Sequence, residues 1–506
     1  MADSPYTVID AAGAPDWGDS ADVVIAGLGV AGACAAIEAR EAGADVLVLE
    51  RASGGGGTTA NAAGHVYLGG GTRVQKAVGV EDDVEDMYSY LLMNTPVPEA
   101  DKIRLYCDES VAHFDWLVAQ GVPFNDTMFH GKHFMQMTDE CLIWSGNEEA
   151  WPFREKAKPA PRGHKVAKVA EGGGALMVER LVERMRALGV RIEVNTAVQQ
   201  LVRESGRIAG VRAKTFDAQK AIRARRGVIL ATGHFTGNEA MLAKYTPRLL
   251  EEGITRQYTP YDDGAGHQLG AAAGGELLHM DGALITSPFY PPEQLIKGIL
   301  VNRLGKRFVS EDSYHSRSSI YATQQPGGEA YLIVDEKIFA RPLFGHEVVD
   351  AWESVAEMER ALRMPEGSLQ KTLRDYNGHA ARGEDPELHK KGKWVVPIEQ
   401  PPFAAIQFSR GKCAYMGFTL GGLRVSADGE VLRADGSAIP GLYAAGACAA
   451  NIAQDGAGYS SGTCIGESSF FGRRAGRHAA GRPTESADAQ RAEGERRRAP
   501  AETGRN

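Results

Sequence analysis

The glycines of the pattern Gly27-x-Gly29-x-x-Gly32 have the spacing that binds the pyrophosphate of a dinucleotide. In such a site the first glycine permits a tight turn, the second lets phosphates approach the backbone, and the third lets a helix pack on a strand. Glu50 follows Gly27 by 23 residues, about the distance at which an acid binds the ribose hydroxyl groups. The alternative is a glycine-rich turn without a ligand. The acid at this spacing favours the dinucleotide site.

The elements that must position these residues can be predicted from the surrounding sequence. Residues 22–26 (DVVIA) indicate a buried strand, and a helix over about 30–42 and a second strand over 46–49 follow. The motif therefore lies at a helix N-terminus, whose dipole and free N–H groups attract phosphate. Helical spacing is also present over 81–121 and 174–188, and strands are predicted at 190–194, 227–233 and 442–446. This alternation predicts an α/β fold with parallel strands.

Two further segments bear on which dinucleotide is bound. Residues 231–233 (ATG) and 443–446 (YAAG) each end a buried strand. They resemble additional segments of flavoproteins with two dinucleotide-binding domains, in which FAD extends across the whole domain, so FAD is favoured. A second strand-linked G-x-G-x-x-G for a nicotinamide is missing from the sequence. We therefore expect an external electron acceptor or donor: a quinone, another flavoprotein or oxygen.

Three segments of the chain are similar to the fumarate reductase/3-ketosteroid dehydrogenase family of flavoproteins: 298–308 (GILVNRLGKRF), 439–446 (IPGLYAAG) and 456–462 (GAGYSSG). The resemblance covers about residues 20–480. It implies a cap domain that follows the first segment and closes over the isoalloxazine ring. It also implies a helix that begins near Gly462 and directs its N-terminus at the N1/O2 edge of the flavin.

The fold expected from these signals is α/β: a Rossmann-like FAD-binding domain of glutathione reductase type with an inserted α+β catalytic cap domain. The FAD-binding domain would occupy residues 1–282 and 403–481, and the cap domain 283–402, whose borders are rich in proline and aromatic residues. Residues 53–72 are interpreted as a glycine-rich loop that wraps a ligand. Residues 482–506 contain no Val, Ile, Leu, Met, Phe, Trp or Tyr, which predicts a disordered tail.

The resemblance also implies that FAD is held without a covalent bond. The loop 57–61 (GTTAN) lacks the histidine to which succinate dehydrogenases of the family attach their flavin. The expected cofactor-binding residues come from the glycine motif, this loop, the strand ends and the start of the last helix. They are Gly27, Gly29, Val30, Ala31, Gly32, Glu50, Arg51, Thr58, Thr59, Asn61, Gly64, Ala197, Val198, Ala231, Thr232, Gly233, Asn238, Asp263, Gly446, Ala447, Ser461, Gly462 and Thr463.

The sequence departs from fumarate reductases where those enzymes carry arginines for two substrate carboxylates. Tyr459 occupies the place of the arginine in the family's Gly-Ala-x-Arg segment. Tyr314 or His315 falls about where the proton-donating arginine stands, although Arg317 is near. Hydroxyl groups in place of cations suit an uncharged, largely apolar ketone. Tyr314 with residues 459–461 (YSS) is most similar to the 3-ketosteroid Δ4-(5α)-dehydrogenases of the family.

Desaturation beside a ketone, the reaction that the resemblance implies for steroid catabolism, removes an α-proton and transfers a β-hydride to flavin N5. We expect the Ser461 hydroxyl to take the C4 proton, Tyr314 to relay it towards solvent, and Tyr459 to orient or polarise the C3 carbonyl. The roles of the two tyrosines could be exchanged, and each hydroxyl could instead bind only backbone. Because free tyrosine has a pKa near ~10, a basic role needs either a lowered pKa or a concerted transfer.

Other activities fit the same residues. The enzyme could run in reverse, as an FAD-dependent enone reductase of steroids or bile-acid intermediates, or it could reduce small unsaturated acids, which the missing arginine disfavours. A flavoprotein that only carries electrons is the alternative from a different class. Six aromatic residues could line a steroid slot or belong to the core: Phe124, Phe129, Phe134, Trp144, Trp151 and Phe153.

Composition and charge argue against several other classes. The 56 Lys and Arg residues against 65 Asp and Glu give a net charge of −9, which opposes a nucleic-acid partner. The apolar run 23–37 is interrupted by three glycines and is too short to span a membrane. Six scattered cysteines without a C-x-x-C pair predict a reducing, cytoplasmic location. His130 and His133 lack further ligands at a metal-site spacing, so no metal is expected.

Overall fold

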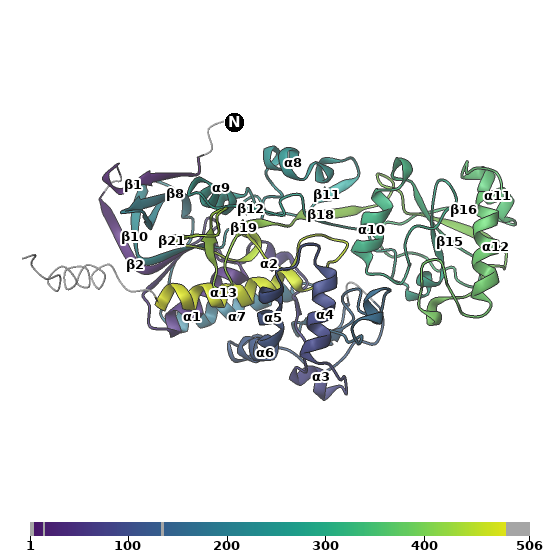
Figure 1. The fold of residues 1–506 in the computed structure, drawn as a ribbon, viewed down its shortest axis with the longest axis horizontal. Helices are drawn as coiled ribbons and strands as arrows, with labels where there is room; N and C mark the ends of the chain where they lie inside the picture. The colour runs from purple at the N-terminus through teal and green to yellow at the C-terminus, as the bar shows by residue number, and fades with distance from the viewer. Residues whose placement is uncertain (1–4, 14–15, 133–135, 482–506) are drawn as a thin grey trace, which may run out of the picture.

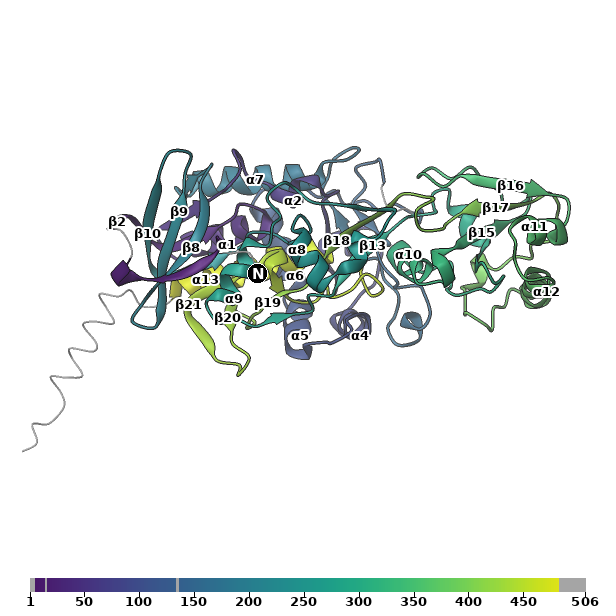
Figure 2. The same cartoon turned by 90° about the horizontal axis from the view of Figure 1, so that it is seen from above.

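The computed structural model describes residues 5–13, 16–132 and 136–481. The predicted tail 482–506 and His133 lie outside the described residues. The described chain is elongated, with a larger lobe at one end of its long axis and a smaller lobe at the other (Figures 1 and 2). In the described ranges we find no helix whose length and apolar character together would let it cross a membrane.

The larger lobe is built on a nine-stranded sheet with the order β1-β8-β9-β10-β2-β3-β7, to which β21 and β20 are added beside β10. The centre of the sheet is parallel: β2 (Trp17–Ala26) pairs with β3 (Val46–Leu49) and with β10 (Gln219–Leu230), and β10 pairs with β21 (Ala438–Ala444). Strand β3 and the carboxyl ends of β2 and β10 consist largely of Val, Ile and Leu, as is typical of strands that are covered on both faces. The outer strands are β1 (Thr7–Asp10), β7 (Arg191–Glu193), β8 (Ala197–Glu204), β9 (Arg207–Lys214) and β20 (Glu430–Leu432).

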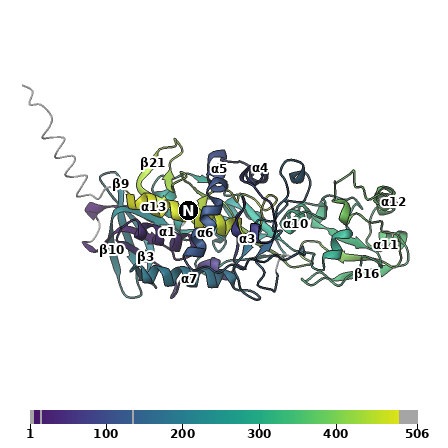
Figure 3. The ribbon, with the colours of Figure 1, turned by 90° about the horizontal axis from the view of Figure 1, so that it is seen from below.

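Three helices lie together on one face of this sheet (Figures 1 and 3). They are α1 (Val30–Glu41), α7 (Gly173–Ala187) and α13 (Thr463–Gly481). The predicted helices over 30–42 and 174–188 therefore form, and the last helix begins where the family resemblance places it. The predicted helical region over 81–121 is divided into three helices beside them, α4 (Val84–Asn94), α5 (Ala100–Asp108) and α6 (Ser110–Ala119).

Helix α13 lies directly against the backbone of α1. A Cβ atom at Gly472 would come within 2.5 Å of the Ala31 carbonyl oxygen, and one at Gly476 within 2.1 Å of the Ala35 carbonyl oxygen. Gly472 contacts Ala31, and four residues further along both helices Gly476 contacts Ala35. The two helices are therefore parallel. Their N-termini therefore face the same end of the sheet.

Small sheets and short helices accompany the nine-stranded sheet. One sheet joins β4 (His65–Tyr67), β5 (Leu142–Ile143) and β6 (Gly163–Lys165), and another joins β11 (Ile254–Arg256), β18 (Tyr415–Thr419) and β13 (Ala283–Thr286). The third joins β12 (Leu277–Leu278), β19 (Gly422–Arg424) and β22 (Ala449–Ala450). The short helices are α2 (Gly57–Asn61), α3 (Arg73–Ala77), α8 (Glu239–Tyr245) and α9 (Ala265–Ala272).

The segment 53–72 is more ordered than the sequence predicted. It contains α2 and β4 rather than a continuous loop, and His65, Val66 and Tyr67 in β4 are buried. Although the segment has few apolar side chains, its backbone forms the hydrogen bonds of α2 and of the pairing between β4 and β6. The prediction of a continuous loop is therefore wrong for these residues.

The smaller lobe has its own antiparallel sheet, in the order β14-β15-β17-β16, and its own buried core. The strands are β14 (Ile299–Asn302), β15 (Ala330–Val334), β16 (Val348–Trp352) and β17 (Phe403–Gln407), with α11 (Val355–Ala361) and α12 (Ser368–Ala380) packed beside them. The predicted boundary at 402 falls immediately before β17, so we propose that the cap domain extends through this strand. Helix α10 (His315–Thr323) lies between the two lobes in all three views (Figures 1, 2 and 3).

Candidate active site

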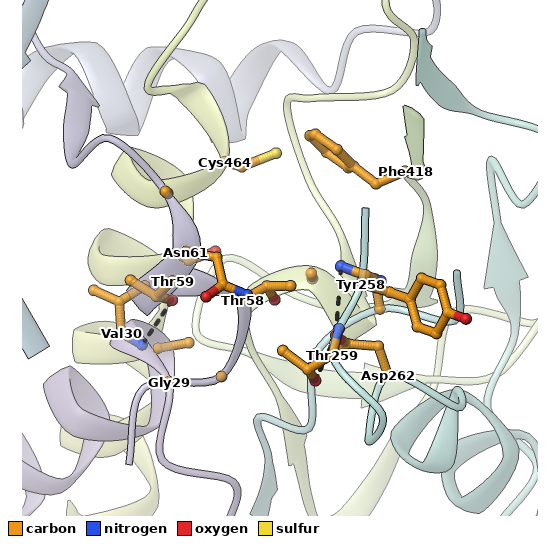
Figure 4. Close-up of a pocket in the computed structure, with 18 of the residues that line it drawn as sticks. Gly29, Val30, Thr58, Thr59, Asn61, Tyr258, Thr259, Asp262, Phe418 and Cys464 are labelled. Atoms are coloured by element: carbon orange, nitrogen blue, oxygen red, sulfur yellow. Dashed lines mark hydrogen bonds and ion pairs between the residues drawn. The ribbon is translucent and has the colours of Figure 1, made fainter. Parts of the chain in front are cut away.

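A cavity of about 820 Å³ lies at the carboxyl ends of the central parallel strands. This is where open α/β sheets bind their ligands, and the volume is that of a pocket for a large organic molecule. Figure 4 shows the turn at Gly29 and Val30 and the residues of α2 on one side, with Tyr258, Asp262 and Phe418 across from them. The predicted cofactor-binding residues on the wall are Gly27, Gly29, Val30, Ala31, Glu50, Arg51, Thr58, Thr59, Asn61, Gly64, Ala197, Val198, Ala231, Thr232, Gly233, Gly446, Ala447, Ser461 and Gly462.

The glycine turn between β2 and α1 is shaped to accept a phosphate. Gly27 has φ +105°, and a Cβ atom there would lie 2.3 Å from the Ala231 carbonyl oxygen. Gly29 is the N-cap of α1 and offers no capping side chain, while the Val30 N–H donates to Thr59 Oγ1 at 3.3 Å. The other first-turn N–H groups of α1 are therefore available to an anion at the positive end of the helix.

Glu50 is placed for a ribose at the end of β3. Its Oε2 accepts the Leu28 N–H and its Oε1 accepts the Ala52 N–H, each at 2.7 Å. Burial raises the pKa of Glu50, whereas these two backbone donors favour its carboxylate. Each carboxylate oxygen retains a lone pair, so the side chain on the cavity wall can also accept from ribose hydroxyl groups.

Four predicted cofactor-binding residues lie behind the wall: Gly32, Asn238, Asp263 and Thr463. Asp263 accepts from Arg51 and from the Tyr6 hydroxyl, each at 2.6 Å. Asn238 caps α8 and donates to the Asp263 carbonyl oxygen. These residues support the wall, and their direct contact with a cofactor stays a prediction. Tyr6, which lines the cavity from the residue before β1, had no local sequence signal.

The N-terminus of α13 opens on the same cavity as that of α1. Ser461 and Gly462 lie on the wall, and α13 begins at Thr463. Since Gly472 lies against Ala31, α13 extends beyond the start of α1 by roughly eight residues, or about 12 Å at the rise of an α-helix. Two positive helix ends therefore occur at separate positions along one long cavity. An elongated cofactor with a pyrophosphate and an electron-accepting ring fits this arrangement.

The three predicted catalytic residues come together at the α13 end of the cavity. The Tyr314 and Ser461 hydroxyl groups form a short hydrogen bond, and the Tyr314 and Tyr459 rings lie 6.4 Å apart between centroids. Phe418 packs edge-on against Tyr459 at 6.4 Å. Burial raises the pKa values of both tyrosines. The site therefore does not favour a tyrosinate, and of the two predicted routes concerted transfer through neutral hydroxyl groups is the one it suits.

The histidines at this end are also neutral near pH 7. Burial lowers the pKa of His65 to about 4 and that of His315 to about 3. Arg317 lies off the wall, with its guanidinium over the Phe153 ring and near the Ala457 carbonyl oxygen. The arginines among the described wall residues are Arg51 and Arg256, and each forms an ion pair with a carboxylate.

The predicted aromatic slot is not part of this wall. Phe124 and Phe153 belong to the core of the larger lobe, which is one of the two interpretations of the sequence. Phe129, Trp144 and Trp151 also lie off the wall, and Phe134 is outside the described residues. The wall instead carries aromatic residues from other segments: Tyr6, Tyr258, Tyr261, Tyr314, Phe418 and Tyr459.

A family model described as an FAD binding domain matches residues 22–465 of the chain. The chain belongs to this FAD-binding family. The cofactor is therefore FAD, and the protein is an FAD-dependent oxidoreductase; the glycine turn, Glu50 and the two helix ends fit the pyrophosphate, ribose and ring of this group. The resemblance drawn from the three sequence segments is confirmed.

Individual members of the FAD-binding family and solved structures define the similarity further. The chain is 32% identical to a 3-oxo-5-alpha-steroid 4-dehydrogenase of Comamonas testosteroni, over 85% of this chain and 93% of that protein. It is 43% identical to the crystal structure of a 3-ketosteroid-delta4-(5alpha)-dehydrogenase from Rhodococcus jostii RHA1 in complex with 4-androstene-3,17-dione, with a TM-score of 0.87 over 94% of this chain and 99% of that one. It is 28% identical to a urocanate reductase of Eggerthella lenta, over 91% of this chain and 74% of that protein.

Proposed function

We propose that the protein is an FAD-dependent 3-ketosteroid dehydrogenase that introduces the C4–C5 double bond beside a 3-keto group. The observation that carries this proposal is the hydrogen-bonded Tyr314–Ser461 pair on the cavity wall, with Tyr459 beside it. The two Δ4-dehydrogenases to which the chain is similar support the same reaction.

The hydroxyl groups of Ser461, Tyr314 and Tyr459 have different roles in removing the α-proton. Ser461 Oγ accepts the C4 proton while its own proton passes to Tyr314 Oη, and Tyr314 Oη releases its original proton to solvent water. Both hydroxyl groups end neutral, and the net change is one proton moved from C4 to water. Tyr459, which burial keeps protonated, donates a hydrogen bond to the C3 carbonyl oxygen as negative charge develops there. When bound, FAD supplies the acceptor for the C5 hydride.

The electrostatics of the wall favour an uncharged substrate. At this end the wall carries two neutral histidines and three neutral hydroxyl groups. The arginines on the wall already form ion pairs with carboxylates of the protein. A dicarboxylate would need bidentate guanidinium partners to compensate for its desolvation. The same site could catalyse the reverse reduction of an enone, because the direction depends on the redox partner.

The test is anaerobic mixing of the purified holoprotein with 5α- and 5β-saturated 3-ketosteroids while the oxidised flavin absorbance is followed. We expect bleaching with a 5α-3-ketosteroid, since the similar enzymes are named for 5α substrates. Failure of every 3-ketosteroid to bleach the flavin would overturn the proposal and favour the electron-carrier alternative. Reoxidation of the reduced protein by a small unsaturated acid would favour the reductase alternative.

The electron acceptor and the cellular location are also proposals. We infer an external acceptor, a quinone, a flavoprotein or oxygen, because the sequence has one G-x-G-x-x-G motif. A cytoplasmic location is supported by the six cysteines, all of which have free thiols. Comparing reoxidation rates by a soluble quinone and by oxygen distinguishes two of the acceptors.

A further inference from the structure

Tyr314 and Ser461 belong to segments 147 residues apart, yet their hydroxyl groups must meet within hydrogen-bond distance. Tyr314 is the N-cap of α10, which lies between the lobes, and Ser461 precedes α13 in the larger lobe. Something other than the two side chains must hold both segments in place. A third segment, residues 145–147, binds the backbone of both.

Each catalytic residue donates its backbone N–H to this 145–147 segment. The Ser461 N–H donates to the Ser145 carbonyl oxygen at 2.7 Å, and the Tyr314 N–H donates to Asn147 Oδ1 at 2.9 Å. Ser145 and Asn147 are almost completely buried, so water does not compete for these bonds. The separation of Tyr314 from Ser461 is thus set by two positions that are two residues apart.

The Asn147 side chain also ties this segment to the loop that carries Ser461. Its Nδ2 group is 3.4 Å from the Ala457 carbonyl oxygen, to which it donates. Its backbone N–H donates to Tyr90 Oη at 2.8 Å, and Tyr90 Oη bonds Ser460 Oγ at 2.8 Å. One amide therefore binds α10 with its oxygen and the Ser461 loop with its nitrogen.

Gly146 allows this close approach. A Cβ atom at this position would lie 2.1 Å from Ser460 Oγ and 2.5 Å from Tyr90 Oη. A side chain here would clash with the Ser460 and Tyr90 side chains, and one of the three would have to shift. The glycine therefore lets the 145–147 segment pack closely on the loop that carries Ser461.

We propose that residues 145–147 are a positioning template for proton transfer, with Asn147 as the positioning residue that aligns Tyr314 with Ser461. The inference rests on the proposed function, because it assigns the template to the hydroxyl pair that moves the proton. Asn147 touches neither substrate nor cofactor in this role. A displacement of about 1 Å between reacting groups can cost about 100-fold in rate, so a template that fixes their separation matters to the rate even though it takes no part in the chemistry.

The experiment compares Asn147→Leu with Asn147→Asp in the FAD-loaded protein. Leucine has a similar size but removes both hydrogen bonds, whereas aspartate keeps an oxygen that can accept the Tyr314 N–H. For Asn147→Leu we expect flavin reduction by a saturating 3-ketosteroid to slow by about 10- to 100-fold, with steroid affinity changed less than about threefold. We also expect a larger solvent isotope effect on reduction, because proton transfer becomes more rate-limiting. Asn147→Asp should recover part of the rate.

The matched control is Asn377→Leu in α12 of the smaller lobe. Asn377 also uses both ends of its amide, donating to the Ile398 carbonyl oxygen at 2.8 Å and accepting the Ile398 N–H at 2.9 Å, but it is remote from the cavity wall. We expect a lowered Tm and an unchanged reduction rate. This control separates general destabilisation from misalignment.

Three results bear on the inference in different ways. A reduction rate within twofold of wild type in an FAD-loaded Asn147→Leu protein would overturn the template. Loss of FAD from both Asn147 variants would also overturn it, because the segment would then support the cofactor rather than the hydroxyl pair. If wild-type protein itself fails to be reduced by any 3-ketosteroid, the proposed function has failed instead.

Discussion

Removing the Tyr314 hydroxyl by Tyr314→Phe should separate its chemical role from its packing role. The ring would keep its contacts with His315, at 3.9 Å between centroids, and with Tyr459, at 6.4 Å. The hydrogen bond to Ser461 would be lost, which costs about 1 kcal/mol net. Ser461 is half-buried on the cavity wall, so water can satisfy its hydroxyl. The free energy of unfolding should therefore change little.

The rate should fall far more than the stability. Loss of a general acid–base group typically costs about 10²- to 10⁴-fold, which corresponds to about 3 to 5 kcal/mol of activation free energy. The assay is stopped-flow reduction of the bound flavin by a 5α-3-ketosteroid, with FAD content and Tm measured on the same sample. Tyr376→Phe, in a buried tyrosine of α12, should leave the rate unchanged. A Tyr314→Phe rate within threefold of wild type would refute the proton relay.

Three further substitutions test other parts of the site. Tyr459→Phe should lower turnover by about 10²- to 10³-fold with FAD still bound, as expected for loss of one donor to a developing oxyanion; equal turnover in the variant would remove Tyr459 from the mechanism. Glu50→Gln should weaken FAD binding by about 10- to 100-fold, since hydrogen bonds to charged groups contribute about 1.5–3 kcal/mol, and fluorescence of released flavin measures this. Glu467 of α13 lies on the cavity wall, where its Oε2 accepts the Ile452 and Ala453 N–H groups. Burial raises the pKa of Glu467 to about 7 from 4.5, so its stability contribution is present at low pH and is lost as pH rises from about 4.5 through 7. The free energy of unfolding of Glu467→Gln relative to wild type should accordingly increase between pH 4.5 and 8, by up to about 3 kcal/mol, and a pH-independent difference in denaturant titrations would contradict it.

The local signals of the sequence predicted the nucleotide half of the site well. The strand predicted at 46–49 and the helix predicted at 30–42 match β3 and α1 within a residue. A run of β-branched residues, a glycine turn and an acid at fixed spacing are properties of one continuous stretch, so they can be recognised without tertiary information. The strand predicted at 22–26 forms the end of the longer β2.

The parts of the site made by distant segments could not be predicted in the same way. The 145–147 segment carries no motif, and its importance comes only from hydrogen bonds to Tyr314 and Ser461. Tyr6 reaches the cavity because β1 pairs with β8, which nothing near Tyr6 indicates. The aromatic residues of the sequence could not be assigned to core or pocket for the same reason, because core packing and pocket lining use the same side chains; Phe124 and Phe153 belong to the core.

Gly472 and Gly476 of α13 pack so closely on the backbone of α1 that the two helices hold each other in a fixed position. A slide of α13 by one turn, about 5.4 Å, would carry Ser461 away from its partner and leave the phosphate turn untouched. Bulky replacements at these two glycines would separate α13 from α1 and press on Ala31 beside the phosphate turn, so they should lower both turnover and FAD retention. Because Gly472 and Gly476 lack side chains, α13 can pack on α1 closely enough to fix the position of Ser461 relative to the phosphate turn.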